Sequence, residues 1–228
     1  MCTATRWFVT ADSWANTPKD STTSSWLFPP RTQEVQFDEK WSFVFKKEEH
    51  CNPQDPADAH RGDWWDHTAF DAEHKLVLCV VPGARGVEEA EAVVAEAKRR
   101  TGGHPVRLMT SDDYPAYKEA ILHIYGSEVG TTPTGRLSKR MVPEKVPPPG
   151  LTYATVEKRR RLGRVVEILV HLIFGTFAAL ARALRLSRVS RRVNVSFLER
   201  YHATDRHKNA RRCGRRTRSR RIGGCTSR

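Results

Sequence analysis

Three strand-like segments precede the first helix-like segment, and this order is the strongest constraint on the fold. Residues 34–46 alternate apolar with polar side chains, and residues 63–72 and 75–82 form two further strand patterns after a polar loop. The short interval over 71–74 favours a turn between the last two segments. We therefore expect a three-stranded meander.

Helix and strand patterns alternate after the meander. Residues 87–101 carry acids in the first turns and bases in the last, which complements the helix dipole. The remaining predicted elements are strands over 105–111, 151–160 and 164–174, a proline-rich loop over 127–150, and helices over 114–125, 176–186 and from Asn194 or Ser196 to about residue 212. A meander followed by alternating units predicts an α/β fold with helices on both faces of a mixed sheet.

A chain of 228 residues is long enough for one domain with a sizeable core. We expect an irregular leader over residues 1–33, one folded domain over 34–212 and a basic disordered tail over 213–228. The tail alone holds six arginines, in a chain whose 39 basic and 26 acidic residues give a net charge of +13. Such a charge indicates an anionic partner, nucleic acid before an acidic membrane surface.

Cysteine usage and hydropathy predict a cytoplasmic protein. The five cysteines form no CxxC pair and the first residues lack the apolar segment of a signal peptide, so reduced thiols are expected. The apolar run over 165–184 has the length of a membrane span, but Glu167, His171 and Arg182 interrupt it. We expect a buried strand and an amphipathic helix there, and no membrane segment.

The alternation over 34–46 places Asp38 on the polar face of its strand, with Gln36 and Lys40. Glu39 falls on the apolar face, where an unpaired charge is costly. Asp38 is therefore the better candidate metal ligand, although an ordinary exposed acid at a sheet edge has the same signature.

Two further acids occupy positions where a site can form. Asp112 sits at the C-terminal end of the strand over 105–111, at the edge where open α/β sheets place their sites, although Asp112 or Asp113 also suits a helix cap. Glu199 lies on the last predicted helix, two turns before Arg206 on the same face; surface ion pairing is the alternative. Carboxylates from two strands and a helix suit hard divalent cations, and two such ions can promote displacement at a phosphodiester.

The three acids lie within a set of motifs that occur in a fixed order. These motifs are Gln36-Phe-Asp-Glu-Lys-Trp-Ser-Phe-Val, Gly62-Asp-Trp-Trp-Asp-His67, Thr110-Ser-Asp-Asp-Tyr-Pro-Ala-Tyr117, Pro149-Gly-Leu-Thr-Tyr-Ala-Thr155 and Phe197-Leu-Glu-Arg-Tyr-His-Ala-Thr-Asp-Arg-His-Lys-Asn-Ala-Arg211. Together they resemble bacterial insertion-sequence transposases of the DDE class, most nearly the insertion-sequence-one-like family, over roughly residues 30–212.

The resemblance implies a ribonuclease-H-like fold and a catalytic triad of Asp38, Asp112 and Glu199 that holds two Mg²⁺ or Mn²⁺ ions. It also implies contacts with DNA from the basic residues that follow the glutamate, namely Arg206, Lys208, Arg211 and Arg212. The implied reaction is nicking at the element ends and attack of the freed 3′-hydroxyl on target DNA, without a covalent protein–DNA intermediate. The implied active complex is a homo-oligomer on DNA in the bacterial cytoplasm, associated with the nucleoid.

The chain departs from this family at both ends. Relatives carry an N-terminal DNA-binding part, with a helix-turn-helix, that residues 1–33 do not supply. They also continue with a Phe-Ser-Lys-Asp-Trp-like run where this chain has an arginine-rich tail. A nucleotide stretch encoding Lys-Asp-Trp-Arg-Val-His-Glu-Ser encodes residues 221–228 when read one base later. One hypothesis is therefore that residues 213–228 are a frameshift product.

Other interpretations of the sequence stay open. The alternative function is a non-catalytic, basic DNA-binding remnant of a decayed transposase. His50, Cys51, His60 and His67 have the residue types of a zinc site, but their spacing matches no standard pattern. The basic run over 158–161 could meet phosphates, although such runs are more often simply solvated.

Overall fold

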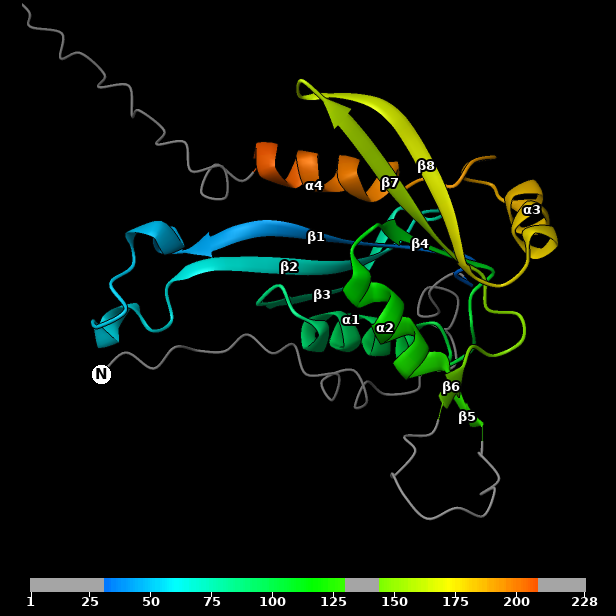
Figure 1. Cartoon of the computed structure of the whole chain (residues 1–228), viewed down its shortest axis with the longest axis horizontal. Coiled ribbons are helices and arrows are strands. Elements are labelled where there is room, and N and C mark those ends of the chain that lie inside the picture. Colours follow the sequence, from blue (N-terminus) through cyan, green and yellow to red (C-terminus); the bar gives the residue numbers. More distant parts are fainter. Residues whose placement is uncertain (1–30, 130–143, 209–228) are drawn as a thin grey trace, which may run out of the picture. The chain divides into compact units, whose positions relative to one another are not determined.

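The computed structural model describes residues 31–129 and 144–208 (Figure 1). The predictions for residues 1–30 of the leader, for the tail over 213–228, and for Arg211 and Arg212 lie outside these described residues. The elements are β1 (Glu34–Val44), two short 3₁₀ helices (Glu48–His50 and Pro56–Asp58), β2 (Gly62–Asp71), β3 (Leu76–Gly83), α1 (Val87–Arg100), β4 (Leu108–Asp112), α2 (Pro115–Tyr125), β5 (Ser127–Val129), β6 (Glu144–Val146), β7 (Tyr153–Arg161), β8 (Arg164–Phe174), α3 (Phe177–Leu186) and α4 (Ser196–Lys208).

The main sheet has six strands in the order β3-β2-β1-β4-β7-β8. β1 pairs antiparallel with β2, and β2 pairs antiparallel with β3, which is the expected meander. β4 lies on the other side of β1 and runs parallel to it, and β7 runs parallel to β4. A meander extended by two parallel strands is the ribonuclease-H-like arrangement, so the predicted α/β fold class is confirmed.

Helices cover both faces of this sheet, as Figure 1 shows for α1 and α2 on one side and α4 on the other. α1 and α2 pack in one buried cluster with Phe37 of β1 and Tyr153 of β7. On the opposite face, α3 packs over Ala154, and α4 inserts Leu198 against Phe70. The two faces therefore have separate cores, and β7 contributes to both, with Tyr153 in one and Ala154 in the other.

Some element boundaries differ from the prediction. β1 ends at Val44 rather than at 46 because Phe45 takes a φ of 65°, a left-handed conformation that interrupts an extended strand. β4 begins at Leu108 rather than at 105, because its pairing with β1 starts at Leu108, opposite Glu34. Its last residue is Asp112, so the expectation that this aspartate lies at the C-terminal end of the strand is confirmed.

The segment over 127–150 contains more structure than the predicted loop. β5 and β6 form a small antiparallel pair in which Ser127 lies opposite Val146. Each of these strands has three residues, which is too short for a hydrophobic period to appear in the sequence.

The apolar run over 165–184 divides into β8 and α3, as predicted. Gly175 separates them with a φ of +96°, and a Cβ atom there would lie 2.9 Å from the carbonyl oxygen of Leu151. The break is therefore fixed by the backbone at a residue that only glycine suits. Within the described part of the chain, no helix is long and apolar enough to cross a membrane. The strand itself is more exposed than expected, since Val166 and Ile168 are more than half exposed.

Candidate active site

The parallel pairing of β1 with β4 brings two of the predicted acids together. Phe37 lies opposite Ser111, which places the following residues, Asp38 and Asp112, side by side at the ends of the paired segments. One carboxylate oxygen from each of Asp38, Glu39 and Asp112 lies within 4.8 Å of the other two. The sequence predicted the two aspartates for this position, but not the glutamate.

Glu39 points to the face shared with the core, as the strand alternation predicted, but it is not an unpaired charge. Arg85, in the loop between β3 and α1, donates from Nε and Nη2 to Glu39 Oε1, at 2.9 and 2.6 Å. The side chain of Glu39 is only 2% exposed, and its burial raises the pKa of its carboxyl group. The strand pattern alone favoured Asp38 over Glu39 as a ligand because it does not show the distant partner of Glu39, which is Arg85.

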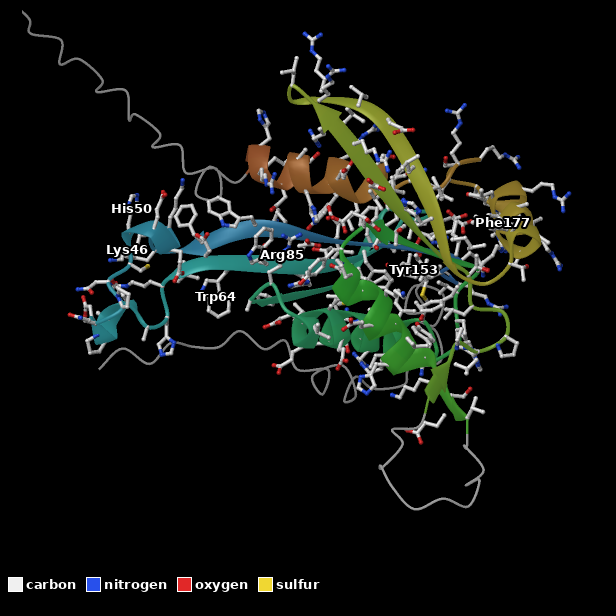
Figure 2. All side chains as sticks on the ribbon, in the orientation of Figure 1. Lys46, His50, Trp64, Arg85, Tyr153 and Phe177 are labelled. Atoms are coloured by element: carbon white, nitrogen blue, oxygen red, sulfur yellow. The ribbon has the colours of Figure 1, made fainter. Side chains whose placement is uncertain are left out.

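Arg85, which is labelled in Figure 2, is itself held by two aromatic rings. Its guanidinium lies 4.8 Å from the ring centroid of Trp65 and 4.6 Å from that of Tyr114, both within cation–π range. The Tyr114 hydroxyl also donates to the backbone oxygen of Arg85 at 3.1 Å. These contacts fix the direction from which the arginine reaches Glu39.

Asp112 has the most perturbed carboxyl group of the cluster. Burial raises its pKa to about 7, and the neighbouring carboxylates of Glu39 and Asp38 add to the effect. Its Oδ1 atom is buried without a hydrogen-bond partner among the described residues. The expectation that Asp112 or Asp113 caps the next helix is wrong, because α2 begins at Pro115 with Tyr114 as its N-cap residue.

Glu199 reaches the same region from α4. It lines a cleft of about 450 Å³ together with Asp38 and Asp112, so the three predicted residues share one cavity. The other lining residues are Arg85, Asp113, Tyr114, Pro115, Val156, Glu157, Lys158 and Arg160. Glu199 does not join the group of three close carboxylates, since Lys158 of β7 forms an ion pair with its Oε1 atom. The predicted alternative for Glu199, pairing with a nearby base, is therefore present within the cleft.

Polar side chains on one face of β1 attach α4 to the sheet. Gln36 accepts a hydrogen bond from the backbone nitrogen of Leu198 at 3.0 Å and donates to the backbone oxygen of Asn194 at 2.9 Å. His202 Nδ1 lies 3.2 Å from Asp38 Oδ2, and Lys40 donates to Asp205 at 2.5 Å. Alternate residues of the strand thus contact successive turns of the helix. The sequence predicted this polar face, but not what covers it.

The remaining candidate residues lie away from the cluster. Arg206 and Lys208 are exposed on the last turn of α4 and are not among the residues that line the cleft. The proposed zinc ligands are not gathered into a site within the described ranges, and His67 instead contacts the backbone oxygen of Ala84 at 2.9 Å. In the run over 158–161, Lys158 and Arg160 line the cleft, while Arg159 pairs with other acids.

Comparison with known proteins gives limited information. No family model and no curated protein matches the chain. Part of the chain is similar to the solved structure of a Mos1 transposase paired-end complex with left transposon end, with 17% sequence identity and a TM-score of 0.25. The match covers 40% of this chain and 33% of the other, so it spans about a third of the length of that protein.

Proposed function

We propose that residues 34–212 form the catalytic domain of a DNA transposase of the insertion-sequence-one-like family. The observation that carries this proposal is that Asp38, Asp112 and Glu199 line one cleft. These three acids belong to motifs that lie far apart in the sequence. A fold that gathers all three around one cavity is what a two-metal site requires.

The group of close carboxylates, of which Asp38 and Asp112 line the cleft, suits Mg²⁺ or Mn²⁺. The three close donors are all carboxylate oxygens, the ligand type that hard divalent cations prefer. Glu39 Oε2 and Asp112 Oδ1 are buried without a hydrogen-bond partner in the described ranges, as expected of atoms that await a cation. Two bound ions would activate a water or a 3′-hydroxyl and stabilise the leaving oxygen at a phosphodiester.

The protein's own side chains would bind and orient the DNA backbone. Lys158 and Arg160 line the cleft from β7 and would contact phosphates beside the acids. Arg206 and Lys208 would extend these contacts along α4. The reaction would be nicking at element ends followed by strand transfer of the 3′-hydroxyl into target DNA, within a homo-oligomer at the bacterial nucleoid.

The proposal is tested by nicking of supercoiled plasmid DNA with Mn²⁺ or Mg²⁺. The full chain should convert the plasmid to the open circle only when the metal is present. Asp112→Asn should be slower by at least about 100-fold, because it removes a buried ligand. Glu119→Gln, which changes an exposed acid of α2, should nick like the wild type. Equal traces of nicking by the wild type and Asp112→Asn would refute the enzymatic function.

One observation favours a second candidate, the non-catalytic DNA-binding remnant. Glu199 is paired with Lys158 and its side chain is 44% exposed, so the helix-borne acid is not held at the cluster. A remnant of this kind would bind plasmid DNA at low salt and never nick it. The nicking assay, run beside a DNA-binding titration of the same preparation, therefore separates the two functions.

A further inference from the structure

We propose that Glu39 is a metal ligand, and that Asp38, Glu39 and Asp112 form a divalent-cation site that is complete without Glu199. This inference deepens the proposed function, on which it rests for the role of the metal. It differs from the triad implied by the motifs because it assigns a ligand that the triad omits. All three side chains come from β1 and β4, so the site belongs to the sheet alone.

The two oxygens of Glu39 are in different states. Oε1 receives both hydrogen bonds from Arg85, which fixes the orientation of the carboxylate. Oε2 is buried and has no hydrogen-bond partner in the part of the chain that the structure describes. A carboxylate with one oxygen anchored and the other unsatisfied has the form of a metal ligand oriented by a second residue.

Of the other two acids, Asp112 also has an unsatisfied oxygen, whereas both oxygens of Asp38 have contacts. Asp38 Oδ1 accepts from the backbone nitrogen of Glu39 at 3.0 Å, and Asp38 Oδ2 faces His202. Asp112 leaves its buried Oδ1 atom without a partner within the described ranges. Two buried, unsatisfied oxygens therefore come from neighbouring strands and belong to carboxylates whose closest oxygens lie within 4.8 Å of one another.

The charge of the cluster also calls for a cation. Three carboxylates lie together, and their described basic partners are Arg85, which forms an ion pair with Glu39, and His202, whose Nδ1 lies 3.2 Å from Asp38 Oδ2. Arg85 contacts Glu39 from the side of Trp65 and Tyr114. Its hydrogen bonds go to Oε1, so the buried Oε2 atom of Glu39 has no hydrogen-bond partner among the described residues. A hard divalent ion with oxygen ligands satisfies both the charge and the open atoms.

Glu199 stands apart from this arrangement because Lys158 pairs with it. The site formed by Asp38, Glu39 and Asp112 can consequently bind an ion while Glu199 remains paired with Lys158. Glu199 would then be needed for the second ion and for reaction on DNA, but not for the first binding step.

The test is a calorimetric titration of Mn²⁺ alone into the full chain and three variants. Glu199→Gln should keep one site with an affinity within about 3-fold of the wild type. Glu39→Gln, which retains the size of the side chain, should weaken that site by at least about 10-fold. Glu34→Gln is the matched control, because Glu34 is also buried on β1 but is the first residue of the strand, whereas Glu39 lies at its middle. It should bind Mn²⁺ like the wild type.

Folding of the variants is followed by thermal unfolding with and without Mn²⁺. The wild type and Glu199→Gln should be stabilised by the metal, and Glu39→Gln should unfold cooperatively but gain much less. Glu39→Asp keeps the charge and withdraws the carboxylate by one methylene, so it should show the same loss if Glu39→Gln fails to fold.

The outcomes separate this inference from the proposed function. Wild-type affinity in Glu39→Gln or in Glu39→Asp, together with loss of the site in Glu199→Gln, would overturn the inference and leave the transposase proposal intact. A wild-type chain that neither binds Mn²⁺ nor nicks DNA would instead overturn the proposed function.

Discussion

Asp112 is the residue of the cleft whose carboxyl pKa is raised by both burial and neighbouring carboxylates. Burial, followed by repulsion from Glu39 and Asp38, raises its pKa from 3.8 to about 7. The folded protein therefore retains a proton on Asp112 between about pH 4 and pH 7, whereas the unfolded chain has already released it. Stability contributed by this group is present at low pH and is lost as the pH rises through that window.

Because the raised pKa of Asp112 destabilises the folded protein at high pH, replacing this residue by asparagine should stabilise it there. At pH 8 the variant should be more stable than the metal-free wild type, by an amount on the order of 4 kcal/mol at most, since each pH unit of difference is worth about 1.4 kcal/mol. The advantage should shrink toward zero at pH 4.5. Urea unfolding at both pH values, in the presence of EDTA, measures it. Parallel pH profiles for the two proteins would show that Asp112 titrates normally.

The position of a single residue could be predicted where strand alternation determines it. It could not be predicted where a partner distant in the sequence determines it. The alternation over 34–46 placed Asp38 and Glu39 on opposite faces correctly. The role of Glu39 depends on Arg85, which is 46 residues away in the sequence, and on the turn that brings it back. No local pattern reports such a pair, so the buried glutamate could be recognised only as a costly charge.

At the scale of elements, the attachment of α4 to β1 decides whether Glu199 faces the cleft. The apolar contact of this helix with the sheet centres on Leu198 and Phe70, and the ring of Tyr201 stacks on Phe70. The attachment also has a polar part, in which Gln36 provides hydrogen bonds at the N-terminal end of the helix. Helix termini leave backbone groups unsatisfied, so a side chain that bonds two of them fixes the entry of the helix.

Gln36→Leu should therefore loosen α4 selectively. The change leaves the backbone nitrogen of Leu198 without its acceptor, and the free energy of unfolding should fall by about 1–3 kcal/mol. Hydrogen exchange should accelerate over 196–208, while α1 over 87–100 serves as the internal reference. Nicking should fall more than Mn²⁺ binding, because the three close carboxylates belong to β1 and β4, and only Asp38 among them has a described contact with α4, through His202. Uniform acceleration of exchange over both helices would contradict a local role for Gln36.

The existence and order of the elements followed from the sequence, but the polar attachment did not. Periodicity found the strands and helices to within a few residues because it reflects burial on one face. Gln36 and Leu198 are 162 residues apart, and an ordinary glutamine carries no signal of what it will bond. The pair β5 and β6 was missed for another reason, since three residues are too few to display a period.

At the scale of the whole molecule, the meander and the alternating units specify the sheet order because few topologies satisfy both. An antiparallel meander fixes β1, β2 and β3 in sequence order, and the helical connections α1 and α2 then allow parallel strands beside β1. This is why the fold class could be predicted from element order. Which ends of the strands meet follows from the same topology, and it brings Asp38 beside Asp112.

Net charge is the property of the whole chain that bears most directly on DNA. Replacing the six arginines of residues 213–228 by glutamine lowers the net charge from +13 to +7, since each removes one positive charge. If these arginines neutralise phosphates, affinity for duplex DNA should fall, and the slope of log affinity against log salt should become shallower by up to about 5. Fluorescence anisotropy over a range of salt concentrations measures both, and Mn²⁺ binding should not change. An unchanged slope would assign DNA binding to the folded domain. It would also favour the frameshift origin of residues 213–228, because the arginines of this tail would then make no contact with phosphates.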